Sequence, residues 1–161
     1  MPKRIYLEAR MRAGEWERIW LDLAYDHGMR RGEIAVVNSN DLVEDLIGWS
    51  LYVHGKGNRT RLIPLTGAMA NTLRELGEGW LFPGDDNGHI SPRWLGKRVN
   101  RLIEGSWTMH KGRHAAGTRW NEHGGLLVAR DLLGHASVAT TEIYCKVPDG
   151  QLRVTLEATA S

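Results

Sequence analysis

The hydrophobic pattern near the start of the chain is helical. Between residues 15 and 26 the apolar positions recur three and four residues apart, which places them on one face of a helix. These positions are Trp16, Ile19, Trp20 and Leu23. Gly28 follows as a helix terminator, and the next segment predicts a short second helix over residues 31–36.

The pattern changes between Asp41 and Leu65. Three short runs rich in β-favouring residues, DLVED, WSLYV and TRLIPL, are separated by turn residues around Ile47 and Gly48 and in GKGN. Successive β-favouring runs joined by short turns pair as antiparallel hairpins. The segment therefore predicts a three-stranded antiparallel sheet.

Helical patterns return after Leu65. They predict helices over residues 66–76, 92–103, 108–123, 126–133 and 137–146, with a sharp turn at Gly134. The pattern after Pro148 favours neither a helix nor a strand. We therefore predict a single α+β domain over residues 1–161, mostly α-helical with one small antiparallel sheet.

Composition narrows the class of protein. The 161 residues are 42% apolar and 25% charged, which is typical of one globular domain. Cys145 is the only cysteine, which excludes an intramolecular disulfide framework and a cysteine-rich zinc site. No apolar run is long enough to cross a membrane, so we expect a cytoplasmic protein. The net charge of +2 does not by itself indicate a nucleic-acid partner. The positions of the basic residues must therefore show whether the protein binds nucleic acid.

Two basic residues lie at predicted junctions. Arg30 in HGMRRGEI follows a glycine break between two helices, where its side chain can project away from a solvated helix face. Taken alone, this arginine is more simply interpreted as an ordinary partner of Glu33. Lys56 lies between two glycines at the predicted tip of the second hairpin. The spacing there does not fit a P-loop, and an isolated turn lysine would also be ordinary.

The run MHKGRHAAGT carries a compact basic cluster. Thr108 is the predicted N-cap, so His110 lies in the first turn and shares a helix face with Arg113. Free backbone amides and the positive end of the helix dipole favour an anion there. His110 and His114 have the spacing of a metal-ligand pair, but HKGRH contains no carboxylate and places an arginine beside them. We therefore expect an anion such as phosphate and no metal.

The run LLGHASVATTEIY adds His135 and Tyr144. A lone tyrosine is usually a core residue, but this one completes a set of two arginines, one lysine, two histidines and one phenol. Guanidinium groups match phosphate oxygens, and a protonated lysine can donate a proton to a leaving group. A phenol can attack when a base assists it. The set fits attack by a phenol on a phosphodiester.

These four sequence motifs, in this order along the chain, resemble those of the tyrosine recombinase (phage integrase) family, and in particular those of actinobacterial phage integrases. GMRRGE is similar to the family's arginine box, GKGNRTRLIPL to its hairpin lysine, HKGRH to H-x-x-R-H, and LGHASVATTEIY to its closing box. The similarity runs from about Glu15 to Lys146 and implies that family's catalytic-domain fold. It implies these catalytic residues: Arg30, Lys56, His110, Arg113, His135 and the nucleophile Tyr144.

The resemblance also implies a reaction that stores bond energy in the protein. Tyr144 would join a DNA 3′-phosphate and release a 5′-hydroxyl, and the reverse step onto a partner strand would need no cofactor, metal or ATP. Arg30 and Arg113 would bind the non-bridging oxygens, and Lys56 would protonate the leaving oxygen. His110 would act as the base for the phenol, and His135 would form a hydrogen bond with the phosphate. Glu33 would orient and neutralise the groups around it.

A predicted helix gives separate support for a DNA partner. Arg93, Lys97 and Arg101 recur every four residues within residues 92–103, and Leu95 and Val99 lie on the opposite side. A basic stripe opposite a packed face is suited to DNA, although a solvated surface helix has the same pattern.

The family resemblance implies further partners and a biological role. The partners are double-stranded DNA with attachment-site-like core sequences, other recombinase protomers in a tetramer on synapsed DNA, and a directionality factor or host DNA-bending protein. The implied role is site-specific recombination of the phage integration and excision type. Chromosome-dimer resolution, topoisomerase-like relaxation and a catalytically silent DNA-binding module of the same fold are the alternatives.

Two features depart from the family pattern. Gly112 replaces a usual leucine, and glycine costs ~1 kcal/mol in a helix interior. We therefore expect a packing gap and a less rigid helix beside His110 and Arg113. Only about fourteen residues precede the first predicted helix, so we expect no separate N-terminal DNA-clamping domain in this chain. An excised catalytic domain and a natural protein without the clamp both fit.

Overall fold

The architecture comes from a computed structural model that describes residues 1–55, 59–134 and 149–160. In these ranges, α-helices pack against a three-stranded antiparallel sheet, which confirms the predicted mostly helical α+β class. The helices are α1 (Lys3–Arg12), α2 (Glu15–Tyr25), α3 (Arg31–Ala35), α4 (Gly67–Glu75), α5 (Pro92–Leu102), α6 (Met109–Leu133) and α7 (Asp149–Thr159). The strands are β1 (Leu42–Asp45), β2 (Gly48–Gly55), β3 (Arg59–Pro64) and the short β4 (Pro83–Asp86), and a 3₁₀ turn, η1, covers Ser39–Asp41.

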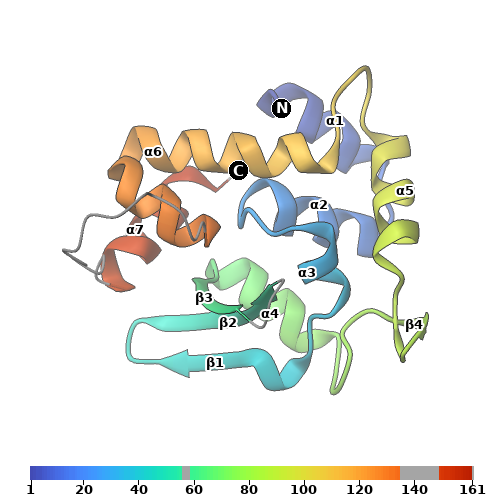
Figure 1. The fold of residues 1–161 in the computed structure, drawn as a ribbon, viewed down its shortest axis with the longest axis horizontal. Helices are drawn as coiled ribbons and strands as arrows, with labels where there is room; N and C mark the ends of the chain where they lie inside the picture. The colour runs from blue at the N-terminus through green and yellow to red at the C-terminus, as the bar shows by residue number, and fades with distance from the viewer. Residues whose placement is uncertain (56–58, 135–148, 161) are drawn as a thin grey trace.

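The long helix α6 runs across the molecule, and its C-terminal end contacts β3 of the sheet. Figure 1 shows the sheet with α4 in the lower half, α1, α2 and α6 in the upper half, and α5 along one side. The C-terminal helix α7 contacts both α6 and β3. Within the described residues, no helix has the length and apolar composition needed to cross a bilayer.

The sheet follows the predicted strands. Its order is β1-β2-β3, and Leu51 of β2 pairs with Ile63 of β3. Both side chains are fully buried, because alternate positions of each strand face the core. Asp45 closes the first turn, since its Oδ1 accepts the N–H groups of Ile47 and Gly48. The three β-favouring runs therefore form strands where the sequence predicted them.

Helix α2 supplies the centre of the core. The apolar positions that predicted the helix include Ile19, Trp20 and Leu23, and all three are buried. The Trp20 ring meets the rings of Phe82 and Trp94 edge to face, at centroid distances of 5.7 and 6.2 Å. Such contacts fix the relative orientation of large apolar surfaces. They hold α2 against α5 and the segment before β4.

Two glycines shape α6 and the chain beside it. Gly125 has φ 82° and ψ 172°, so α6 consists of two helical stretches, as the separate predicted helices 108–123 and 126–133 indicated. Gly28 has φ +59°, and a Cβ atom there would lie 2.5 Å from Cη2 of Trp120. Glycine therefore permits both the left-handed backbone and the close approach. This approach places the chain before α3 directly against α6.

The sequence did not predict α1, β4 or α7. Helix α1 buries only Ile5, Tyr6 and Ala9, and its position depends on tertiary contacts such as the stacking of Tyr6 on Tyr25 at 4.0 Å. Strand β4 has only four residues. Helix α7 is held by the fully buried Leu156, which packs with α6 residues, and by Arg153, which donates to the carbonyls of Trp49 and Leu65. Short or weakly periodic segments such as these leave little signal in the hydrophobic pattern.

The packing gap expected beside Gly112 is wrong. A Cβ atom at Gly112 would lie 3.2 Å from Cε of Met1 and 3.9 Å from Cδ2 of Tyr25, so these side chains already fill the space. The Gly112 N–H also donates to the Thr108 carbonyl at 3.1 Å, which continues the helix. The glycine therefore makes room for the Met1 side chain, while Tyr25 of α2 lies at ordinary contact distance.

His27 is a buried polar residue between α2 and α3. Its Nε2 accepts the N–H of Thr66 at 3.4 Å, so Nδ1 carries the proton and faces the Asp22 carbonyl, also at 3.4 Å. Burial lowers the pKa of His27 to about 4, although the contact with Asp22 opposes the shift. The imidazole is therefore neutral in the folded protein at neutral pH.

The free energy of unfolding should fall as the pH drops from about 6.5 to 4. The unfolded chain takes up a proton at His27 near pH 6.5, whereas the folded chain resists until about pH 4, so protons favour unfolding in this window. The contribution is roughly 3 kcal/mol at its full extent. Urea unfolding across this window measures it. His27→Gln should lose much of this dependence, whereas the exposed-histidine control His123→Gln should keep it; equal pH dependence in both variants would contradict the prediction.

Candidate active site

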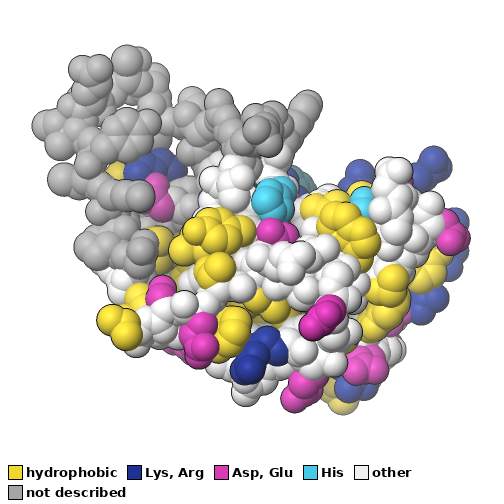
Figure 2. Space-filling model, turned by 90° about the horizontal axis from the view of Figure 1, so that it is seen from below, with side chains coloured by type: hydrophobic (Ala, Val, Ile, Leu, Met, Phe, Trp, Pro, Cys, Tyr) yellow, Lys and Arg dark blue, Asp and Glu magenta, His cyan; other side chains and the backbone are white. Residues whose placement is uncertain are grey.

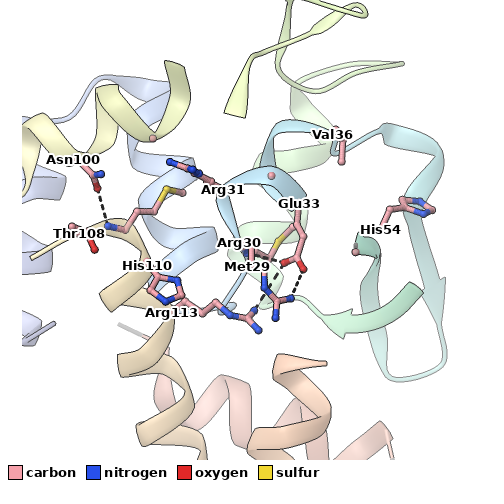
Figure 3. Close-up of a pocket in the computed structure, with 14 residues that line it drawn as sticks. Met29, Arg30, Arg31, Glu33, Val36, His54, Asn100, Thr108, His110 and Arg113 are labelled. Carbon is pink, nitrogen blue, oxygen red and sulfur yellow. Dashed lines mark hydrogen bonds and ion pairs between the residues drawn. The ribbon is translucent and has the colours of Figure 1, made fainter. Parts of the chain in front are cut away.

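A cleft of about 780 Å³ lies among α3, α5, the start of α6 and the end of β2. Arg30 and Glu33 line it from the α3 segment, and His110 and Arg113 line it from α6. Figure 3 shows the side chains of Arg30, Glu33 and Arg113 directed toward one another, with His110 beside Arg113. The structure thus brings four of the predicted site residues into one cleft.

Glu33 lies at the centre of a basic cluster. Its Oε1 accepts from Nη1 of Arg30 at 2.8 Å and from Nη1 of Arg61 at 2.7 Å. Its Oε2 accepts the backbone N–H of Arg30 at 2.7 Å and Nη2 of Arg61 at 2.8 Å. Nη1 of Arg113 lies 4.0 Å from the same Oε2. One carboxylate therefore joins three guanidinium groups, and the local charge remains positive.

The pKa of Glu33 shows that the cluster favours the ionised carboxylate. Burial alone would raise this pKa, because the side chain is only 4% exposed. The hydrogen bonds and charge of Arg61 and the hydrogen bonds from Arg30 outweigh burial and lower the pKa to about 2. Glu33 is therefore ionised at neutral pH and holds Arg30 in place. The Arg30–Glu33 pair considered from the sequence is present, and it faces the cleft.

Arg113 is 4% exposed and is held by two backbone carbonyls. Its Nη1 donates to the Gly28 carbonyl, and its Nη2 donates to the Leu133 carbonyl at 2.7 Å. Burial and the charges of Arg30 and Arg61 lower the pKa of Arg113 to about 10, so the group stays protonated at neutral pH. These bonds use two of the five guanidinium N–H donors and fix its plane.

His110 lies one helical turn before His114 on α6. Their Nε2 atoms are 3.0 Å apart and the rings are perpendicular. One hydrogen bond between facing nitrogens needs one donor and one acceptor, so at least one ring is neutral. Burial, followed by the charges of His114, Arg113 and Arg30, lowers the pKa of His110. The neutral form, which can act as a base, is therefore favoured at neutral pH.

Polar caps position the start of α6. Oγ1 of Thr108 accepts the Lys111 N–H at 3.3 Å, which confirms the predicted N-cap. Oδ1 of Asn100, on α5, accepts the Met109 N–H at 2.9 Å. These bonds satisfy otherwise free amides of the first turn and fix it against α5. His110 therefore projects from an anchored turn.

Lys56, His135 and Tyr144 lie outside the described residues, as does the predicted helix 137–146. Residues on their flanks are described. Gly55 lines the cleft. Gly134 has the left-handed conformation, with φ +63°, and ends α6, which confirms the predicted turn.

Arg61 is a site residue that the sequence interpretation missed. It lies on β3 opposite Val53, and only 12% of its side chain is exposed. Val53 is buried, and so is Ile63, which lies two residues after Arg61 on β3. The period of two along the strand therefore places a charged residue at a core-facing position. That pattern requires a buried partner and was the signal available in the sequence.

The predicted basic stripe is exposed on α5. Arg93, Lys97 and Arg101 are exposed, while Leu95 and Val99 are fully buried. In Figure 2, lysine and arginine side chains gather along the right-hand edge, the side on which α5 lies in Figure 1. The stripe is therefore accessible to a large partner.

The histidine pair is not part of a larger ligand cluster in the described ranges. There, no group of three or more His, Cys, Asp or Glu side chains is arranged to hold a metal ion. Arg113 and Arg30 lie close enough to His110 to lower its pKa. Their positive charge makes this part of the cleft more suitable for an anion than for a cation.

Comparison with curated proteins gives consistent relatives. The family model described as "Phage integrase family" matches residues 3–150. The tyrosine recombinase XerC of Methylobacterium sp. (strain 4-46) is 33% identical over 171 residues, covering 92% of this chain and 53% of the relative. The tyrosine recombinase XerD of Rhizobium meliloti (strain 1021) is 30% identical over 149 residues, covering 82% and 47%. The chain thus spans about half the length of these relatives.

Solved structures share the fold. The integrase from mycobacterium phage Brujita has a TM-score of 0.76 and 28% identity, covering 98% of this chain and 57% of that protein. The lambda integrase catalytic core has a TM-score of 0.65 and 23% identity, covering 82% and 92%. The fold is therefore that of tyrosine recombinase catalytic cores, as the sequence predicted. Together with the family match over residues 3–150, these relatives establish that the chain belongs to the phage integrase family of tyrosine recombinases.

Proposed function

We propose that residues 1–161 form the catalytic domain of a site-specific DNA recombinase that cuts and rejoins DNA through a 3′-phosphotyrosine at Tyr144. The observation that carries the proposal is the cleft in which Arg30 and Arg113 flank Glu33, with His110 beside them. Family membership supports the same activity.

The charge balance of the cleft suits a phosphodiester. Three guanidinium groups surround the single carboxylate of Glu33, so positive charge remains for an anion. Arg30 is 46% exposed at the cleft, and its planar fork matches non-bridging phosphate oxygens. Charge on those oxygens grows as phosphorus becomes five-coordinate. By analogy with oxyanion donors, each fixed donor contributes ~10²- to 10³-fold in rate.

The proton transfers follow from the remaining residues. The Tyr144 oxygen bonds to phosphorus while the bond to the DNA 5′-oxygen breaks; His110 accepts the phenol proton and Lys56 donates one to the leaving oxygen. His135 donates a hydrogen bond to the phosphate. The phosphotyrosine retains the bond energy, so a 5′-hydroxyl can reverse the step without metal or ATP.

The proposed partners are duplex DNA and further recombinase protomers. XerH has been solved bound to its difH substrate, and lambda integrase as a dimer bound to a COC′ core site. By analogy, this chain binds attachment-site-like core DNA and acts in a tetramer on two synapsed duplexes.

Two roles remain candidates. Phage-type integration and excision is supported by the Brujita integrase, which covers 98% of this chain. Chromosome-dimer resolution is supported by the XerC relatives, of which the first is 33% identical. Cleavage assays on attachment-site cores and on dif-type cores from the same host would distinguish them, because the preferred site is cut faster at equal DNA concentration.

A nicked half-site DNA tests the chemistry. The nick lies next to the cleavage position, so the strand released by attack diffuses away and the covalent adduct accumulates. The chain should form an adduct whose DNA-linked peptide contains Tyr144, and the Tyr144→Phe control should form none. An adduct on another residue, or no adduct from the unmodified chain, would contradict the proposed function.

Removing one charge of the α5 stripe should weaken DNA binding and also make it less dependent on the salt concentration. Lys97→Ala should lower affinity for all DNA sequences alike and reduce the slope of log K against log salt by about 0.9 if one phosphate contact is lost. Gel-shift titrations at several salt concentrations measure both quantities. The control is Arg4→Ala on α1, whose residues do not line the cleft; equal effects of the two substitutions would argue against a DNA-binding stripe.

A further inference from the structure

Arg61 lies within the GKGNRTRLIPL motif but outside the set of catalytic residues that the resemblance implies, and it makes the most hydrogen bonds of the three clustered arginine side chains. Its Nη1 and Nη2 donate to the two oxygens of Glu33 at 2.7 and 2.8 Å, which is a bidentate ion pair. Its Nε donates to the Leu132 carbonyl at 3.2 Å. The guanidinium is therefore held by β3, the α3 segment and the end of α6 together.

These contacts place the Glu33 carboxylate. The bidentate pair determines both the plane and the position of the carboxylate, and Arg30 binds the same carboxylate through its backbone N–H and Nη1. Arg30 has 46% of its side chain exposed, so few other contacts restrain it. The position of the Arg30 guanidinium at the cleft therefore depends on Glu33, and the position of Glu33 depends on Arg61.

The end of α6 serves as the anchor for Arg61. Arg61 binds the carbonyl of Leu132, and Arg113 binds the next carbonyl, that of Leu133. Cations at the C-terminal carbonyls of a helix are favourable, because those carbonyls lack partners within the helix. A Cβ atom at Gly134 would clash with Cδ of Arg61, so a glycine there leaves room for the arginine side chain.

We propose that Arg61 is a positioning residue for DNA strand cleavage: its fork sets the Glu33 carboxylate and through it the phosphate-binding guanidinium of Arg30. This inference rests on the proposed recombinase function. Arg61 does not touch the phosphate, so it should alter the rate of cleavage at saturating DNA without altering DNA affinity. A lysine cannot replace it, because one ammonium group cannot hold both carboxylate oxygens in the geometry of a planar fork.

The test measures single-turnover adduct formation on the nicked half-site at saturating DNA, together with the Kd for DNA and the thermal midpoint. Arg61→Lys should slow adduct formation about 10²-fold, as expected for a misplacement of ~1 Å, with a nearly unchanged Kd. Arg61→Met should be at least as slow. If Arg61→Met does not fold, the rate measured for Arg61→Lys still tests the positioning role. The matched control is Arg10→Lys, since Arg10 pairs with Asp22 outside the cleft and should cleave at the wild-type rate.

A double-substitution cycle separates positioning from general structural support. In an Arg30→Ala background, adding Arg61→Lys should slow adduct formation by less than about threefold, because the guanidinium that Arg61 positions is absent. Full additivity of the two losses, or a wild-type rate for Arg61→Lys, would overturn the inference while the adduct of the unmodified chain upheld the recombinase function. Absence of that adduct would refute the proposed function and with it this inference.

Discussion

Replacing Arg113 by lysine is expected to slow adduct formation on nicked half-site DNA about 10²- to 10³-fold, the cost of losing a fixed oxyanion donor. The Arg113 guanidinium is fixed by donation to the carbonyls of Gly28 and Leu133 while it lines the cleft. A lysine retains the charge but cannot reach both carbonyls and a phosphate oxygen at once. Single-turnover kinetics at saturating DNA measure the loss.

The same substitution should also lower stability, so a control has to separate the two effects. Each buried carbonyl left without a donor costs about 1–3 kcal/mol. Arg119→Lys is the matched control, because Arg119 lies on the same helix and donates to the Tyr25 carbonyl but does not line the cleft. It should reduce the thermal midpoint and leave the cleavage rate of the folded protein unchanged. If both variants cleave equally slowly, Arg113 acts through stability and not through the phosphate.

The elements that the sequence predicted correctly are those with one buried face. Helix α2 repeats apolar residues at helical spacing because Ile19, Trp20 and Leu23 all face the same core. Strands β2 and β3 alternate for the same reason. Helix α1 was missed because few of its side chains are buried, and its placement depends on the stacking of Tyr6 on Tyr25, a residue of another helix. A contact of that kind leaves no periodic pattern in the sequence.

The cleft could be predicted only where its contacts are local. Arg30 and Glu33 are three residues apart, and Thr108 caps the helix that carries His110, so spacing alone indicated these relations. Arg61 is 28 residues from Glu33. The carbonyls that hold Arg113 belong to the backbone, which carries no residue-type signal.

The error at Gly112 has the same origin. A missing side chain in a helix predicts a gap only if nothing else fills the space. Met1 and Tyr25 fill it here, and neither is adjacent to Gly112 in sequence. The tightest contact at Gly112 is with Met1, so helix propensity alone gave the wrong expectation for the packing of this part of the site.

The roles of Lys56 and the arginines can be separated by changing the leaving group. Alkoxides leave poorly, because their conjugate alcohols have a pKa near that of water, about 15.7. Thiols ionise near a pKa of ~8.5, so a thiolate needs no proton. If Lys56 is the general acid, Lys56→Ala should cleave ordinary DNA roughly 10²- to 10⁴-fold more slowly. With sulfur in place of the bridging 5′-oxygen, it should approach the wild-type rate.

Arg30→Ala and Arg113→Ala provide the contrast, because their proposed work is on the non-bridging oxygens, which the sulfur substrate leaves unchanged. Neither should recover to the extent of Lys56→Ala. The measurement is single-turnover adduct formation by each variant on both substrates. If Lys56→Ala is equally slow on sulfur-bridged DNA, the lysine binds phosphate or positions DNA, and another residue must protonate the leaving oxygen. His110 would then be the first candidate, because it lines the cleft beside Arg113.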